Sequence, residues 1–99
     1  MAKKGYWIAH VNVTNPERYK DYVAANAAAF KKYNARFLVR GGADSIAPEG
    51  KLKPRHVVIE FDSYATAKAC YESPEYQAAV KLREAASIGD LVIIEGYEG

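Results

Sequence analysis

The order in which strand-like and helix-like segments alternate limits most strongly what this chain can fold into. Apolar residues spaced three and four apart predict a helix over about 16–33, and helix-start signals at Ser63 and Ser73 predict two more over about 64–72 and 74–86. Asn15-Pro16 and Ser73-Pro74 each place a capping side chain before a proline, which is typical of a helix start. Gly89-Asp90 predicts a turn before the last strand. The segments rich in β-branched and aromatic residues, which favour strands, are 5–13, 36–40, 55–61 and 91–97.

This βαββαβ order predicts an α+β domain of the ferredoxin-like type, with a four-stranded antiparallel sheet and its helices on one face. The 99 residues fit a single domain, 1–99. A domain of this size buries only roughly 60–65% of the surface of its unfolded chain, so its core is thin. Association with a second copy would bury additional apolar surface.

Alternation along the first three strands predicts two unlike faces of the sheet. One face is purely apolar and should meet the helices: Trp7, Ala9, Val11, Val13, Phe37, Val39, Val57, Ile59 and Phe61. The other face is mixed: Ile8, His10, Leu38, Arg40, Val58 and Glu60. Because a freely solvated face is usually more polar than this, we expect it to pack against the sheet of a second copy and leave a partly polar cavity. The chain is therefore predicted to form a homodimer through the sheet face.

Three polar residues of the mixed face form a candidate catalytic site. Alternation puts His10, Arg40 and Glu60 on the same side of neighbouring strands. Histidine and glutamate are suited to proton transfer, and a guanidinium can hold a carboxylate in a bidentate fork. His10 and Glu60 are therefore candidate catalytic residues, with Arg40 as a ligand-binding residue. A structural ion pair between Arg40 and Glu60 at the dimer interface explains the same pattern equally well.

The first predicted helix offers two further candidates for ligand binding, Asn26 and Phe30. Asn26 lies on the apolar stripe of this helix, four residues before Phe30. A buried amide needs a hydrogen-bond partner. It could bind a ligand in a pocket, or it could bond to the backbone or to a buried tyrosine.

Tyr71, Ser73 and Tyr76 surround the break between the last two predicted helices. Ser73 is most simply a helix cap, although the amides at that helix start could also bind an anion. The tyrosines fit a core that keeps a polar tip, and they could also line a pocket for an aromatic ligand. All three are candidate ligand-binding residues.

Several function classes are not expected. The net charge of +2 comes from interspersed residues, so no basic face for nucleic acid is predicted. No apolar run approaches the roughly 20 residues that cross a bilayer, and no secretory signal is visible, so we expect a cytoplasmic protein away from the membrane. The single cysteine, Cys70, fits a reducing compartment and a buried position beside Ala67. Two histidines without carboxylates at ligand spacing, and no glycine-rich phosphate loop, predict neither metal nor cofactor.

Four segments together resemble the uncharacterised bacterial family called domain of unknown function 1330. They are 4–9, 36–42, 57–61 and 73–77, of which Arg-Phe-Leu-Val-Arg-Gly-Gly and Ser-Pro-Glu-Tyr are the more specific. The resemblance implies the dimeric α/β-barrel superfamily, in which two ferredoxin-like sheets pack face to face and each subunit holds a pocket between sheet and helices. Relatives by fold include cofactor-free quinone-forming monooxygenases, a muconolactone isomerase and haem-dependent chlorite dismutases. The family itself implies no particular reaction.

Two functional hypotheses follow. The first is a cofactor-independent enzyme that acts on a small acidic or aromatic metabolite, with His10 as acid and base and Arg40 as the holder of the anion. The second is a module without catalysis, which binds a small molecule or serves only to dimerise. A fold alone does not choose between them.

Overall fold

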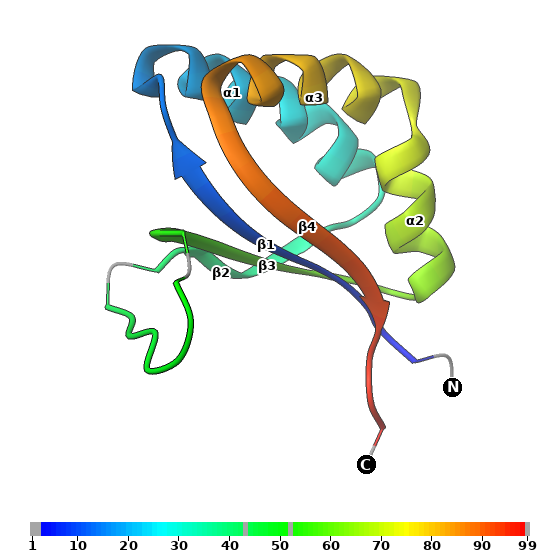
Figure 1. The fold of residues 1–99 in the computed structure, drawn as a ribbon. Helices are drawn as coiled ribbons and strands as arrows, with labels where there is room; N and C mark the ends of the chain where they lie inside the picture. The colour runs from blue at the N-terminus through cyan, green and yellow to red at the C-terminus, as the bar shows by residue number, and fades with distance from the viewer. Residues whose placement is uncertain (1–2, 43, 52, 99) are drawn as a thin grey trace.

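The computed structural model describes residues 3–42, 44–51 and 53–98, and it confirms the α+β ferredoxin-like architecture. The four strands are β1 (Gly5–Val13), β2 (Arg36–Gly41), β3 (Arg55–Phe61) and β4 (Ser87–Glu95). They form one antiparallel sheet in the order β2-β3-β1-β4. The helices are α1 (Pro16–Lys32), α2 (Tyr64–Glu72) and α3 (Pro74–Ala86), and Figure 1 shows them along one face of this sheet.

The helix starts follow the capping signals of the sequence. The Asn15 side chain accepts a hydrogen bond from the Arg18 amide at 3.2 Å. Ser73 Oγ accepts one from the Tyr76 amide at 3.2 Å and donates one to the Cys70 carbonyl at 2.7 Å. The Ser73 hydroxyl therefore closes α2 and opens α3 at once, which confirms its interpretation as a cap.

Trp7 of β1 joins the sheet to the helix layer. Its side chain is buried, and the indole N–H donates to the Ala67 carbonyl of α2 at 2.8 Å. The rings of Phe30 and Tyr76 pack edge-on against it, with centroids 5.3 and 4.8 Å away. Cys70 is buried, as predicted, and burial raises the pKa of its thiol to about 12. A thiol that stays protonated is a packing group rather than a nucleophile.

A β-bulge at Leu38 corrects the predicted faces of β2. The register pairs Phe37 with Ile59, Val39 with Val58, and Arg40 with Val57. Leu38 is therefore an extra residue, and beyond it the alternation reverses. Val39 lies on the outer face, and Arg40 lies on the helix face. The prediction that Arg40 shares a face with His10 and Glu60 is wrong, because it assumed an uninterrupted strand.

The start of β4 also differs from the prediction. Gly89-Asp90 is no turn: β4 begins at Ser87, directly after α3, and runs through both residues. Gly89 pairs with Val11 of β1. A Cβ at position 89 would lie only 3.1 Å from the His10 carbonyl oxygen, so glycine there permits close approach of two strands.

Within the part of the chain that the structure describes, every helix is too short or too polar to cross a lipid bilayer.

Candidate functional site

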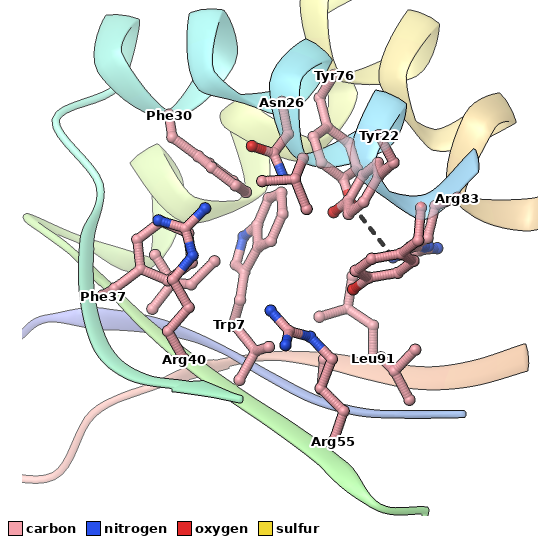
Figure 2. A pocket seen from close by; sticks show the side chains of 16 residues that line it. Trp7, Tyr22, Asn26, Phe30, Phe37, Arg40, Arg55, Tyr76, Arg83 and Leu91 are labelled. Carbon is pink, nitrogen blue, oxygen red and sulfur yellow. Dashed lines mark hydrogen bonds between the residues drawn. The ribbon is translucent and has the colours of Figure 1, made fainter. Parts of the chain in front are cut away.

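A pocket lies between the helix face of the sheet and helices α1 and α3. Its enclosed volume is about 40 Å³, and the whole hollow with its open mouth measures about 470 Å³. Most of its wall is apolar or aromatic, including Trp7, Val23, Phe30, Phe37, Ile59 and Leu91. Figure 2 shows these rings and aliphatic chains enclosing the hollow, with polar side chains directed into it from both layers.

Three arginines from three elements line this pocket: Arg40 of β2, Arg55 of β3 and Arg83 of α3. The Arg40 guanidinium stacks on the Phe37 ring at 4.2 Å, and that of Arg55 lies 5.4 Å from the centre of the Tyr19 ring. Among the described residues, none of the three arginines forms an ion pair with a carboxylate. Arg55 Nε is also buried without a hydrogen-bond partner there. Positive charges gathered without a counter-ion favour an anion.

A hydrogen-bonded group of neutral polar side chains faces these arginines. The hydroxyls of Tyr22 and Tyr76 are 2.8 Å apart, and Arg83 Nη1 donates to the Tyr76 oxygen at 3.2 Å. Burial raises the pKa of both tyrosines, so both keep their protons near neutral pH. Asn26, one helical turn after Tyr22, is buried and lines the pocket.

The structure brings together four of the candidate residues from the sequence and leaves four outside the pocket. Those that line it are Asn26, Phe30, Arg40 and Tyr76. Tyr71 packs edge-on against Trp7, with ring centroids 5.8 Å apart, and takes no part in the pocket lining. Ser73 is 3% exposed, and its hydroxyl is used in the two capping bonds. Tyr71 therefore has a packing role and Ser73 a helix-capping role.

His10 and Glu60 lie on the opposite face of the sheet. His10 Nδ1 is 2.8 Å from His56 Nδ1, its neighbour on β3. Glu60 accepts a hydrogen bond from Arg36 Nε at 2.9 Å, and the Arg36 guanidinium lowers the pKa of this carboxyl. The expected ion pair between Arg40 and Glu60 is therefore wrong, because Arg36 takes that place. The structure does not assemble His10, Arg40 and Glu60 into one site.

Comparison with known proteins places the chain in a family. Residues 4–97 match the model described as "Domain of unknown function (DUF1330)". The chain belongs to this family. No curated protein gives a significant match.

Solved structures similar to this DUF1330 chain share its fold at low sequence identity. One is a protein of unknown function, RPA0582 from Rhodopseudomonas palustris, with 18% identity and a TM-score of 0.76 over 100% of this chain and 86% of that one. Another is SnoaB, described as a cofactor-independent oxygenase from Streptomyces nogalater, with 14% identity and a TM-score of 0.63 over 99% and 97% of the two chains. A third, from Bacteroides fragilis, is described as a dimeric protein of unknown function with a ferredoxin-like fold, with 15% identity and a TM-score of 0.54 over 94% and 96%.

Sequence reasoning missed Arg55, Arg83 and Tyr22, although each left a signal. Arg55 shares the alternation of Val57 and so belongs to the helix-facing side of β3. Arg83 follows Tyr76 by seven residues, which is two helical turns along the same face of α3. Tyr22 lies on the apolar stripe of α1. All three are charged or hydroxyl-bearing residues on the core-facing side of a strand or helix, and a search for that pattern would have identified them.

Proposed function

We propose that this DUF1330 chain binds a small anion with an aromatic or apolar body in the pocket between sheet and helices. One observation carries the proposal: three guanidinium groups converge on an aromatic wall, and none of them pairs with a carboxylate among the described residues. Charges of one sign repel one another in a partly desolvated site. A carboxylate or phenolate would remove this repulsion and accept several charge-assisted hydrogen bonds.

The dimensions of the pocket favour a small ligand that reaches outward. The enclosed volume is about 40 Å³, whereas a single water needs about 10–15 Å³ by a comparable measure. The enclosed part therefore suits only a few atoms, placed against Trp7 and Phe30. The remainder of the ligand would lie in the open mouth, beside the exposed Arg40 side chain that stacks on Phe37.

We further propose that the chain acts on this ligand as a cofactor-independent enzyme. No carboxylate, imidazole or thiol is among the described residues that line the pocket, and both buried tyrosines stay protonated. The reactive group is then the substrate itself. Three nearby cations lower the pKa of a bound phenol or enol and hold it as its electron-rich anion. The description of SnoaB as a cofactor-independent oxygenase supports chemistry of this kind on the fold.

Binding of benzoate, with benzamide as the uncharged control, tests the anion site. We expect benzoate to raise the melting temperature and benzamide to leave it unchanged, since only a ligand of the native state stabilises it. Arg55→Gln should weaken benzoate binding about tenfold to a hundredfold, because it removes a charged hydrogen-bond donor. Arg36→Gln, on the outer face, is the matched control and should leave affinity unchanged. Equal binding of benzamide and benzoate would refute an anion site.

Visible absorption of 4-nitrophenol tests the proposed activation. The coloured phenolate should appear at lower pH when the phenol is bound than when it is free, and Arg55→Gln should abolish this shift. If the bound phenol titrates as it does in solution, the chain is a binding module without this catalytic step. That outcome would leave the anion site intact and remove the enzyme proposal.

We also propose that a second copy of the chain covers the outer face of the sheet. An apolar row crosses all four strands there, formed by Val39, Val58, Ile8 and Val92 in register. Val39 is 37% and Val92 is 48% exposed in the single chain. Apolar rows of this kind are normally covered by a partner. The dimeric description of the Bacteroides fragilis protein supports a copy of the same chain.

Light scattering during size-exclusion chromatography tests this association. The wild-type chain should elute with the mass of a dimer, and Val92→Lys should elute as a folded monomer, because it places a charge in the apolar row. Ala78→Lys is the control, since Ala78 is exposed on α3, away from the sheet. A wild-type chain that is monomeric at micromolar concentration would contradict the proposal.

A further inference from the structure

Three side chains on the helix side of the pocket form a continuous line of hydrogen bonds. Arg83 Nη1 lies 3.2 Å from the Tyr76 oxygen, which lies 2.8 Å from the Tyr22 oxygen. Tyr76 is fully buried, and Tyr22 is 7% exposed. Figure 2 shows these groups across the hollow from Arg40 and Arg55, which come from the sheet.

The direction of this line follows from the chemistry of its first member. A guanidinium donates hydrogen bonds and accepts none, so the Tyr76 oxygen must be an acceptor for Arg83. If Tyr22 also donated to Tyr76, the proton of Tyr76 would have no acceptor among the described residues. In either direction one tyrosine proton has no acceptor among the described residues, and an unsatisfied buried donor costs about 1–3 kcal/mol. Tyr22 is 7% exposed and Tyr76 0%, so the unpaired proton is less costly on Tyr22, where solvent or a ligand can accept it. Tyr76 therefore donates to Tyr22, and each bond in the line points from Arg83 toward the pocket.

The Tyr22 proton is the free end of this line. The Tyr22 oxygen accepts from Tyr76, and this is the one hydrogen bond that the Tyr22 hydroxyl makes among the described residues. The bond from Tyr76 uses the Tyr22 oxygen as an acceptor, so the Tyr22 proton itself is in no hydrogen bond within the part of the chain that the structure describes. Tyr22 lines the pocket, so this proton is directed at whatever occupies the hollow.

We infer that the Tyr22 hydroxyl donates a hydrogen bond to the ligand, which therefore carries a second acceptor in addition to its anionic group. The inference rests on the proposed anion site and narrows its ligand class. The sheet side supplies positive charge through Arg40 and Arg55, whereas the helix side supplies one neutral, oriented donor. A ligand that satisfies both is an apolar or aromatic acid with an oxo, hydroxy or similar acceptor at its inner end. Tyr22 thus selects the ligand by a donor that the apolar wall cannot replace.

The test compares ligands of one shape that differ in a single acceptor. The probes are 3- and 4-cyanobenzoate, with 3- and 4-ethynylbenzoate as controls of equal size that lack the nitrile acceptor. In the wild-type chain one of the cyanobenzoates should bind about threefold to tenfold more tightly than its ethynyl counterpart. Its nitrile stretching frequency should also move to the hydrogen-bonded value. In Tyr22→Phe both the preference for the nitrile and the shift in its stretching frequency should vanish.

A second variant, Tyr76→Phe, checks the direction of the line. If Tyr76 donates to Tyr22, the variant keeps the free Tyr22 proton and the preference for cyanobenzoate. If instead Tyr22 donates to Tyr76, the wild-type chain shows no preference and Tyr76→Phe creates one, which would overturn the inference. Binding of ethynylbenzoate without any preference for the nitrile refutes the role of Tyr22 and leaves the anion site standing. Failure of all four benzoates to bind the wild-type chain would remove both.

Discussion

The two faces of the sheet differ in whether their arginines are paired with carboxylates. On the helix face, Arg40, Arg55 and Arg83 have no carboxylate partner among the described residues, and they surround a hollow. On the outer face, Arg36 pairs with Glu60 at 2.9 Å, and an apolar row crosses this face in register. Paired charges stabilise or specify a structure, whereas unpaired ones in a partly buried site indicate a missing ligand. The comparison points to the helix face as the functional one.

One residue of β2 separates these two arrangements. The bulge at Leu38 sends Arg40 to the helix face and Val39 to the outer face. Without it, Arg40 would sit among the outer polar groups and Val39 would fill the mouth of the pocket. The same bulge therefore supplies a cation to the site and an apolar residue to the row that we assign to the dimer. Bulges commonly re-aim side chains in this way beside functional sites.

The largest expected difference between the faces is in the free energy of unfolding, when two successive residues of β3 are truncated in turn. Ile59 is buried at 3% exposure on the helix face, whereas Val58 lies on the outer face. Ile59→Ala should lower the free energy of unfolding by about 2–5 kcal/mol through lost packing. Val58→Ala should lower it by less than about 1 kcal/mol when the chain is too dilute to associate. Urea unfolding at low protein concentration measures both, and equal losses would break the comparison.

Replacing the capping residue Ser73 should lower stability without changing the affinity for benzoate. Ser73→Ala removes the side-chain bonds that close α2 and open α3, so we expect a loss of about 0.5–2 kcal/mol in the free energy of unfolding. Because Ser73 is no part of the pocket lining, benzoate affinity should stay at the wild-type value. Thermal unfolding with and without benzoate measures both quantities. A selective loss of affinity would return Ser73 to the list of ligand-binding residues.

The fold was predictable because its signals are local. The 2.0 and 3.6 residue periods and the capping residues gave most element bounds, including β1, β3 and α2. The predicted turn at Gly89-Asp90 was wrong because glycine also serves where two backbones approach closely, and only the pairing with Val11 reveals that use. Local sequence does not specify which of the two roles a glycine has.

The site was predictable only in part, because its residues meet through tertiary register. Asn26 was found as a polar group on a core-facing helix stripe and Tyr76 as a tyrosine beside the break between two helices, and both line the pocket. Arg40 was selected for its guanidinium group and placed on the wrong face, since nothing local in 36–42 marks the bulge. His10 and Glu60 were selected by alternation, which correctly put them on one face but could not show that the arginine had left it.

Neutralising one arginine on each face should have unlike effects on the free energy of unfolding, each of at most about 1 kcal/mol. Arg36→Gln breaks the ion pair with Glu60 and should lower the free energy of unfolding. Arg55→Gln relieves repulsion in the empty pocket and should leave it unchanged or raise it. Urea unfolding without ligand measures both variants. A clear loss with Arg55→Gln would mean that a partner on the chain already satisfies this arginine, and the case for a missing anion would weaken.

The smallest expected effect is a pH dependence confined to the outer face. The Arg36 guanidinium lowers the pKa of Glu60 in the folded chain below its unfolded value of about 4.3. A depressed folded-state pKa gives stability that is fully present above the unfolded value and is lost as the pH falls through the folded value. Arg36→Gln should therefore lose less stability than the wild-type chain between neutral and acid pH. Arg55→Gln should keep the wild-type acid slope, because Arg55 lies on the other face and the pairs of Glu75 and Asp90 are intact in both variants. If Arg55→Gln flattened the slope instead, a carboxylate would be coupled to the pocket, and the two faces would not be electrostatically separate.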